Sequence, residues 1–566
     1  MTSGVLLLLP LLMQAQSVPP TDSRLTSLPN TDTHFSVAFD APAYQTREAW
    51  EKRKVQLRRQ ILTAAGLDPM PARTPLHPQI FGRIKTKDCI IEKVLIETMP
   101  GYYLGGNLYR PLDGAGKHPA VLNPHGHWTY GRLENQPLYA GPQLGANLAR
   151  QGYVVFAWDM VGYNDTVQTP HSFGTPAEQL WSFGPVALQL WNAIRAVDFI
   201  TSLDDVDPAR LAMTGASGGA TQTFLLAAVD DRVQTFAPVN MVSAIMQGCD
   251  VCENAPGLRY ATNNVEIAAM IAPKPMILVA ATGDWTRNTA TEEFPALRKI
   301  YALYGKPENL EMVMLDAPHN YNKENREAVY RFFAKHILHA ADAKPYAEKN
   351  AEVRNLQDML ALFGRTPPAG ALTYDQIFEQ WKHRAPRDSP AQEKDALLRT
   401  LGAEWPERVL NDDKALSRAG QGDRVPYTFI DGKGAPALIV GGSPKDAPAG
   451  RPALLIEVFK TRDQSGKHFS AFNHSDDQLR VQDILTALAW LHQKYPTAPV
   501  ELIGVGTAPA VWAEFAAAVA PVPVRLKGDR SAFRGTDEDF LKYFNVPGIQ
   551  LAGGLAAADR LTAASR

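Results

Sequence analysis

Three residues, Ser217, Asp284 and His319, have the types and the chain order of a nucleophile, an orienting acid and a general base. Ser217 lies in the stretch GASGG at 215–219, which fits the pattern of a tight strand-to-helix turn that exposes a serine hydroxyl. A serine hydroxyl attacks poorly until a histidine takes its proton and a carboxylate holds that histidine. The three residues therefore predict acyl transfer through a serine.

Each of these residues also has an ordinary structural alternative. The glycines at 215–219 are compatible with a plain turn, and Asp284 is compatible with a cap of its own turn. His319 is compatible with a loop histidine bonded to backbone, and Asp316, just before it in the chain, is a rival for the role of the acid. The order serine, aspartate, histidine favours catalysis, because sheets with alternating strands and helices use that order.

A negative charge that develops on a substrate oxygen needs two backbone N–H donors. Gly218, directly after the serine, is the expected source of one, and the loop NPHGH at 123–127 is the expected source of the other. Within that loop we favour the amide of His127, with Gly126 as the alternative. His125 and His127 are clustered but lack a carboxylate at matching spacing, so we expect no metal and no other cofactor.

Aromatic and polar residues beside these loops are candidates for substrate contact. Trp128, Tyr130 and Trp285 neighbour the candidate catalytic residues and could stack on a sugar ring, although aromatic side chains in such places are also often simply packed. The stretch CDVCENAP at 249–256 lies between the serine and the aspartate, where Glu253 either lines the pocket or belongs to a loop held by its own turns. Trp128, Glu253 and Trp285 form our candidate set for substrate binding.

The candidate residues all follow segments that alternate as strands and helices. Apolar runs predict strands at 120–122, 153–157, 211–214, 235–242, 275–281 and 310–315, and helices at 186–202, 220–229, 293–304 and 324–338. A helix at 47–66 and antiparallel strands within 81–111 precede them. Such alternation predicts a mainly parallel sheet covered on both faces, with ligand groups beyond the carboxyl ends of the strands.

The composition is that of an ordinary globular protein. At 566 residues the chain is long enough for about two to four domains, with 45% hydrophobic and 20% charged residues. A net charge of −2 offers no attraction to nucleic acid, and no stretch after the first residues is apolar enough to span a bilayer. We therefore expect neither a nucleic-acid partner nor a membrane span in the mature chain.

The first residues differ from the rest of the chain. A nearly unbroken apolar run is followed by Ala15, which predicts a signal peptide at 1–15 and a secreted or periplasmic protein. The run lacks an early Lys or Arg, and a buried N-terminal element is the alternative. Cys89, Cys249 and Cys252 are too few for a disulfide framework, and the latter two are either a local disulfide or two packed thiols.

Together these segments resemble the α/β-hydrolase superfamily, in particular its acetyl xylan esterase-like and dienelactone hydrolase-like branch. The resemblance runs from about residue 81 to residue 338, in the motifs PHGH, GASGG, APKP with TGD, and PH. It covers somewhat under half of the chain. These motifs are specific for the fold and the catalytic triad, but not for the substrate, because members of this branch act on many esters, lactones and peptides.

The resemblance implies a secreted serine carboxylic-ester hydrolase that forms an acyl-enzyme on small-molecule or polysaccharide esters, such as acetylated carbohydrates. One alternative is a serine peptidase of the prolyl-oligopeptidase kind, although the sequence shows no N-terminal propeller repeats. Another alternative is a non-catalytic protein that binds a sugar or a partner. Such a protein would have no need of an intact serine, aspartate and histidine set.

The second half of the chain repeats the pattern in part. After an N-terminal linker and helix at 16–80 and a catalytic domain at 81–340, residues 341–424 predict a helical connector. Residues 425–566 alternate again, but Gly506 stands where the serine of the first turn would be. We predict a second, degenerate and truncated α/β hydrolase-like lobe without an active site. The alternative is that any two strand–helix alternations resemble each other.

Overall fold

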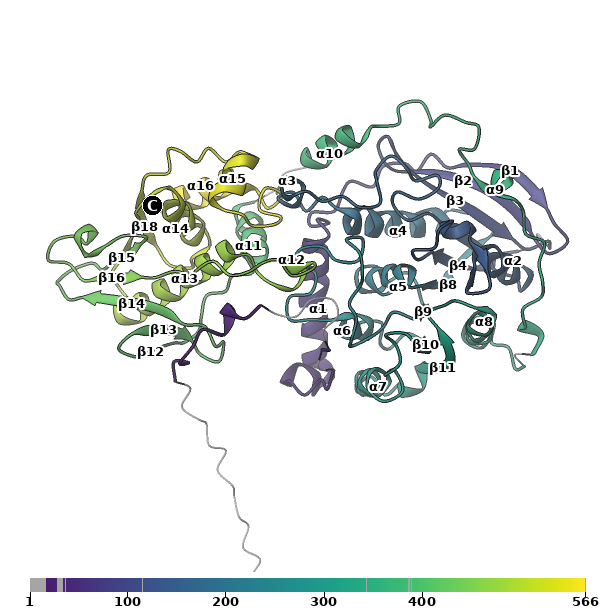
Figure 1. The fold of residues 1–566 in the computed structure, drawn as a ribbon, viewed down its shortest axis with the longest axis horizontal. Coiled ribbons are helices and arrows are strands. Elements are labelled where there is room, and N and C mark those ends of the chain that lie inside the picture. Colours follow the sequence, from purple (N-terminus) through teal and green to yellow (C-terminus); the bar gives the residue numbers. More distant parts are fainter. Residues whose placement is uncertain are drawn as a thin grey trace, which may run out of the picture. The chain divides into compact units, whose positions relative to one another are not determined.

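The computed structural model describes residues 17–27, 34–35, 37–113, 116–342, 344–384, 387 and 389–564 (Figure 1). The predicted signal peptide at 1–15 lies outside the described residues. Contacts divide the described chain into two units. The large unit contains residues 34–384 and 465–473, and the small unit contains residues 17–27, 387–464 and 474–564.

The large unit is built on a nine-stranded sheet. Three antiparallel strands lead into it, and the six strands that follow are parallel to one another. In spatial order the strands are β1 (Gln79–Lys85), β2 (Ile90–Met99), β3 (Tyr102–Arg110), β7 (Val154–Trp158), β4 (His118–Pro124), β8 (Val206–Ala216), β9 (Thr235–Val239), β10 (Met276–Gly283) and β11 (Leu310–Pro318). This topology confirms the predicted α/β fold.

Helices cover both faces of this sheet. Successive residues of β4 point to opposite faces, so that Val121 and Leu122 belong to different buried clusters. The cluster around Val121 includes α2 (Gly141–Arg150), α8 (Lys323–Ile337) and α9 (Leu356–Met359). The cluster around Leu122 includes α1 (Arg47–Ala64), α4 (Pro185–Thr201), α5 (Gly218–Val229), α6 (Asn264–Ala269), α7 (Glu293–Leu303) and α10 (Tyr374–Lys382). Burial on both sides explains why the central parts of the parallel strands, such as β4, β7 and β9, are largely apolar.

The predicted elements appear with shifted bounds. The helix expected at 47–66 is α1, which starts where the Thr46 Oγ1 accepts a hydrogen bond from the Ala49 N–H at 3.1 Å. The strand expected at 211–214 is only the inner part of β8. The first half of β8 is polar and partly exposed, so a search for apolar runs could not detect this half.

The small unit is built on a seven-stranded sheet. In spatial order its strands are β12 (Val409–Asn411), β13 (Ala415–Arg418), β14 (Val425–Ile430), β16 (Ala453–Ile456), β15 (Ala437–Val440), β17 (Val500–Gly504) and β18 (Val524–Gly528). Its helices include α11 (Pro390–Leu401), α13 (Asp476–Lys494), α14 (Thr507–Val519), α15 (Asp537–Tyr543) and α16 (Gly554–Ala564). Residues 17–27, expected to be linker, belong to this unit, where Arg24 pairs with the buried Asp483 at 2.6 Å.

The expected connector at 341–424 is divided between the two units. Helices α9 and α10 belong to the large unit, whereas α11, β12 and β13 belong to the small unit. Conversely, the segment 465–473 with α12 (Phe469–Phe472) belongs to the large unit. Its carbonyls accept backbone hydrogen bonds from Gly257 and Arg259 at 2.8 and 2.9 Å. The large unit therefore takes one of its loops from far along the chain.

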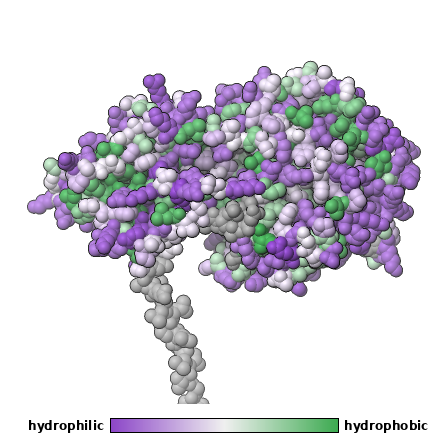
Figure 2. Space-filling view, in the orientation of Figure 1, coloured by the Kyte–Doolittle hydropathy of each residue, from purple (hydrophilic) through white to green (hydrophobic). Residues whose placement is uncertain are grey.

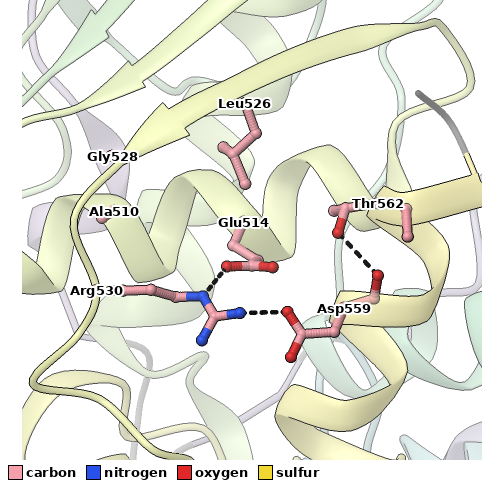
Figure 3. A pocket seen from close by; sticks show the side chains of 8 residues that line it. Ala510, Glu514, Leu526, Gly528, Arg530, Asp559 and Thr562 are labelled. Carbon is pink, nitrogen blue, oxygen red and sulfur yellow. Dashed lines mark hydrogen bonds and ion pairs between the residues drawn. The ribbon is translucent and has the colours of Figure 1, made fainter.

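A pocket of about 340 Å³ lies in the small unit beside strand β18 (Figure 3). Arg530 bonds to the carboxylates of both Glu514 and Asp559 across this pocket. Burial of the Glu514 carboxyl, together with the nearby Asp559, raises its pKa to about 7. Among the described residues that line the pocket there is no serine, histidine or cysteine, and the hydroxyl of Thr562 donates to the Ala558 carbonyl at 3.0 Å, so the pocket holds no pair of a nucleophile and a histidine base.

The visible surface is largely hydrophilic. On the face drawn in Figure 2, polar side chains predominate and hydrophobic ones gather only in small groups. None of the helices in the described part of the chain is long and apolar enough to cross a membrane.

Candidate active site

Ser217 stands at the corner between β8 and α5. Its backbone has a φ of 57° and a ψ of −124°, a conformation that a residue with a side chain adopts only under constraint. A Cβ added to Gly215 would lie 2.6 Å from the backbone of Gly219, and one added to Gly219 would lie 2.4 Å from the carbonyl oxygen of Pro124. The corner therefore requires glycine on both sides of the serine, as the sequence pattern predicts.

The candidate acid and base come from neighbouring strand ends. Asp284 follows β10 and His319 follows β11, and these parallel strands pair with Gly283 opposite Pro318. The Nδ1 of His319 lies 2.9 Å from Oδ2 of Asp284. The other carboxylate oxygen accepts a hydrogen bond from the backbone N–H of Thr286 at 2.7 Å, which fixes the acid. Because an ionised carboxylate only accepts, the ring proton lies on Nδ1 and Nε2 keeps a lone pair.

The Nε2 of His319 is the atom that a general base would use. It is buried and has no hydrogen-bond partner among the described residues. Buried acceptors without partners are uncommon in folded proteins, and a catalytic role is one explanation for them. The ring is held between two indoles, with centroids 4.3 Å from Trp285 and 6.0 Å from Trp128. Both predicted substrate-contacting tryptophans therefore pack against the candidate base.

The rival acid, Asp316, has another partner. Its Oδ1 accepts a hydrogen bond from Oγ1 of Thr282 at 2.6 Å, and the residue is exposed. Asp284 is the carboxylate that bonds to His319.

The loop after β4 lies against the serine corner. A Cβ added to Gly126 would lie 2.9 Å from the Cβ of Ser217. One added to Gly218 would lie 3.1 Å from Cε1 of His127. The structure therefore brings the residues expected to supply oxyanion donors next to the serine.

His125 shapes this loop. Its Nδ1 lies 2.6 Å from the carbonyl oxygen of Gly126, and its Nε2 accepts a hydrogen bond from the backbone N–H of Met160 at 2.9 Å. Burial lowers the pKa of this imidazole to about 3, so the ring is neutral at ordinary pH. With both nitrogens occupied, His125 is not available to share a ligand with His127.

A buried ion network supports the same region. Arg132 pairs with both Asp159 and Asp165, the latter at 2.7 Å, and all three side chains are almost fully buried. Burial raises the pKa of the Asp159 carboxyl to about 6 despite the nearby guanidinium. This network orders the loop after β7 that carries the Met160 N–H. No short motif reveals it, because its members come from different loops.

Glu253, expected to line the pocket, is engaged inside the protein. Its side chain accepts hydrogen bonds from the Thr221 hydroxyl at 2.7 Å and from the Cys249 N–H at 3.0 Å. The residue is only 1% exposed. The structure therefore uses Glu253 to hold the 249–256 segment, partly through a turn of its own, as the alternative had it, and partly through α5, which the sequence did not indicate.

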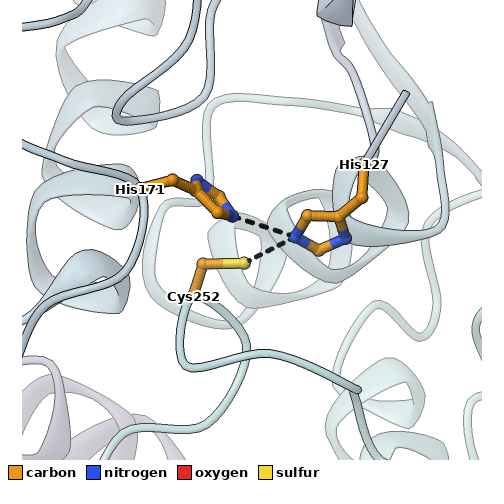
Figure 4. Close-up of side chains that lie close together, drawn as sticks. All are labelled: His127, His171 and Cys252. Carbon is orange, nitrogen blue, oxygen red and sulfur yellow. Dashed lines mark hydrogen bonds between the residues drawn. The ribbon is translucent and has the colours of Figure 1, made fainter. Parts of the chain in front are cut away.

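His127 lies beside two residues that the sequence did not connect with it. Its Nε2 is 3.1 Å from Nε2 of His171 and 3.0 Å from Sγ of Cys252 (Figure 4). Cys249 and Cys252 are free thiols, so the structure does not form the local disulfide. Burial lowers the pKa of His171 and raises that of Cys252, which keeps both side chains neutral near pH 7.

The large unit has the α/β-hydrolase fold, with its serine at the corner after a central parallel strand. This confirms the fold implied by the sequence resemblance. The hydrogen-bonded Asp284 and His319 lie at the ends of the last two strands. Their placement agrees with the order of the three residues along the chain.

Comparison with known proteins gives relatives of the same kind. No family model matches the chain. A protein of Bacillus subtilis (strain 168) with the name "Putative hydrolase YtaP" is 25% identical over 309 residues, which cover 50% of this chain and 99% of that protein. The methylesterase BT1017 is 28% identical with a TM-score of 0.54, over 61% of this chain and 77% of its own. A protein of Bacteroides fragilis NCTC 9343 described as a "putative acetyl xylan esterase" is 16% identical with a TM-score of 0.40, over 50% of this chain and 79% of its own.

Proposed function

We propose that the protein is a serine carboxylic-ester hydrolase. The observation that carries this proposal is the hydrogen-bonded pair of His319 and Asp284, whose buried Nε2 has no partner among the described residues. A strained serine corner lies at the same end of the sheet. The similarity to a methylesterase supports ester hydrolysis as the reaction.

In the proposed mechanism the Oγ of Ser217 attacks the ester carbonyl carbon while Nε2 of His319 takes the hydroxyl proton. Asp284 holds the ring in the tautomer that leaves Nε2 free and stabilises the cation that forms. The backbone amides of Gly218 and His127 donate to the tetrahedral oxyanion. The protonated His319 then gives its proton to the departing alcohol oxygen, and water repeats the sequence to release the acid.

For the substrate we favour an ester of a carbohydrate, either a small molecule or a polysaccharide, including acetylated sugars. Support comes from the family resemblance and from the two indoles at the site, Trp128 and Trp285. The apolar run before Ala15 supports export to the periplasm or the exterior. No step of this mechanism requires a metal, a nucleotide or a nucleic acid.

The peptidase alternative has less support. The described residues outside the large unit form an α/β sheet with helices, whereas a prolyl-oligopeptidase would need propeller repeats. We therefore include proline-containing amides in the substrate test as compounds that the protein should not hydrolyse.

The test combines active-site labelling with a substrate panel. A fluorophosphonate should label the purified full-length protein at Ser217 and should not label Ser217→Ala. The exposed Ser531→Ala is the matched control and should label like the wild type. Aryl and sugar acetates and methyl esters should be hydrolysed, and proline-containing amides should not. A folded Ser217→Ala protein that keeps full ester turnover would overturn the mechanism.

A further inference from the structure

A cluster of metal-ligating side chains lies beside the candidate site and has no part in the proposed hydrolysis. His127 comes from the loop after β4, His171 from the loop after β7, and Cys252 from the segment after β9. One donor atom from each residue lies within 4.8 Å of the others. Figure 4 shows the two rings and the thiol converging from three separate segments.

The protonation of His171 can be derived from its contacts. Its Nδ1 lies 2.7 Å from the carbonyl oxygen of Val161. A carbonyl oxygen only accepts, so Nδ1 carries the proton and Nε2 carries a lone pair. That lone pair faces the Nε2 of His127 at 3.1 Å. A hydrogen bond from one imidazole nitrogen to a backbone carbonyl is also what orients metal-binding histidines in proteins.

Hydrogen bonding alone does not satisfy this cluster. If His127 carries its proton on Nε2, it can donate to His171, but the thiol of Cys252 then has no acceptor in the cluster. If the proton is on Nδ1, the thiol can donate to Nε2, but two nitrogen lone pairs then face each other at 3.1 Å. A cation that accepts all three lone pairs removes the conflict. Coordination through Nε2 leaves one donor of the cluster unpaired, because the Nδ1 of His127, which then carries the ring proton, is buried with no partner among the described residues.

A carboxylate oxygen lies near both of the histidine nitrogens. The Oδ2 of Asp250 lies 3.9 Å from Nε2 of His127 and 3.8 Å from Nε2 of His171. Its other oxygen accepts a hydrogen bond from the Val251 N–H at 2.7 Å, which directs Oδ2 toward the rings. Two imidazoles, one thiolate and one carboxylate are a ligand set that suits tetrahedral zinc.

We propose that His127, His171, Cys252 and Asp250 bind a zinc ion. Ideal zinc bond lengths place two nitrogen ligands about 3.3 Å apart and a nitrogen and a sulfur about 3.6 Å apart. The nitrogens already match, and the thiol has to withdraw from His127 by about half an ångström. Binding converts the thiol to a thiolate and releases its proton to solvent.

The ion joins three loops around the candidate active site. Coordination through Nε2 of His127 places the proton of that ring on Nδ1, the atom next to Gly218. It also anchors the loop whose amide we propose as an oxyanion donor. This consequence rests on the proposed function, whereas metal binding itself does not. The role assigned to the four side chains is therefore positioning, with no redox step.

The first experiment measures metal in the full-length protein. After loading with zinc and removal of loosely held ions, we expect about one zinc per chain. Cys252→Ser and His171→Gln should reduce this to less than about a tenth of an ion per chain. Near-ultraviolet circular dichroism checks that each variant is folded. A wild-type chain that retains no zinc overturns the proposal.

A nearby cysteine provides the matched control. Cys249 is exposed, forms an alternative group with His127 and Glu253, and lies close to Cys252 in the sequence. Cys249→Ser should retain zinc. If Cys249→Ser loses the ion and Cys252→Ser keeps it, the ligand set is wrong.

Cobalt gives a readout that needs no variant. Cobalt bound in place of zinc should show the intense near-ultraviolet band of a thiolate ligand and the visible bands of a tetrahedral ion. Bands of an octahedral ion without thiolate would overturn the assignment. Neither measurement depends on ester turnover, so the failure of the hydrolase proposal would leave the metal result interpretable.

Discussion

The two sheets of this protein share one topology, carried to different lengths. Each begins with three antiparallel strands. The parallel strands, numbered by their order along the chain, then lie side by side in the order second, first, third and fourth. Among the described residues, the sheet of the small unit has β18, the counterpart of β9, as its last strand. The large unit continues with β10 and β11, whose ends carry Asp284 and His319.

The corners after the third parallel strand are packed alike in the two units but differ in backbone conformation. A Cβ added to Gly215 would lie 2.6 Å from the backbone of Gly219 in the helix that follows. A Cβ added to Gly504 would lie 2.4 Å from the backbone of Ala510, which is also in the helix that follows. Two residues later, Ser217 has a φ of 57° and a ψ of −124°, whereas Gly506 has 93° and 166°. The small unit keeps the tight corner but neither the side chain nor the backbone conformation of the serine.

This comparison separates architecture from chemistry. The glycine before each corner is explained by close packing of strand on helix, which both units need. The positions of the acid and the base require two more strands, β10 and β11, which belong to the large unit. That the small unit is a degenerate hydrolase lobe stays a prediction, and the shared strand order supports it.

The largest expected effect tests whether the second corner can take over. Ser217→Ala should lower ester turnover by roughly 10⁶-fold, because members of a triad act as a unit. Adding Gly506→Ser to this variant should restore nothing, since the described sheet of the small unit has no counterparts of β10 and β11 to carry an acid and a histidine. The measurements are turnover of an aryl ester and fluorophosphonate labelling of the double variant.

Gly506→Ser alone is the control and should keep wild-type turnover with one labelled serine per chain. Labelling at position 506 would contradict the distinction between the two corners.

The next effect in size concerns the strand that carries the acid. Asp284→Asn should reduce kcat by about 10⁴-fold with little change in KM, because it disturbs the tautomer and orientation of His319 rather than binding. Asp316→Asn removes a carboxylate that bonds only to Thr282 among the hydrogen bonds described for it, and should stay within about tenfold of wild type. A larger loss of kcat in Asp316→Asn than in Asp284→Asn would show that Asp316, and not Asp284, is the acid.

Much of the large unit could be predicted from local sequence. Apolar strands, a glycine-rich corner and the order of three polar residues were enough for the fold and for the pairing of Asp284 with His319. These features depend on neighbours in sequence or on the regular rule that ligand groups follow parallel strands.

The contacts that the sequence missed join distant segments. His171 and Cys252 reach His127 from separate loops, and no spacing rule connects them. The same holds for Arg132 with its two aspartates. The boundary at 425 was also too simple, because residues 465–473 belong to the large unit. Removing 425–566 would therefore also remove part of the large unit.

The smallest effect we predict concerns the small unit, whose stability should depend on pH through Glu514. In the small unit, the pocket of Glu514, Arg530 and Asp559 lies beside β18, the last strand of its described sheet (Figure 3). Burial and the neighbouring Asp559 raise the pKa of Glu514 from 4.5 to about 7 in the folded chain. The folded state then binds more protons than the unfolded state between these two values. Stability from this group is present below pH 4.5 and is lost as the pH rises through 7.

We expect a loss on the order of 1 kcal/mol in the small unit's free energy of unfolding between pH 5 and pH 8, moderated by the cation of Arg530. Urea unfolding followed by hydrogen exchange of the backbone amides in α13 and α14 would measure it. Glu514→Gln should flatten this dependence, because the side chain no longer titrates. Glu538→Gln, at an exposed position, should leave it unchanged. If stability instead rises with pH, the ion pair with Arg530 outweighs burial, and the pocket holds its glutamate ionised.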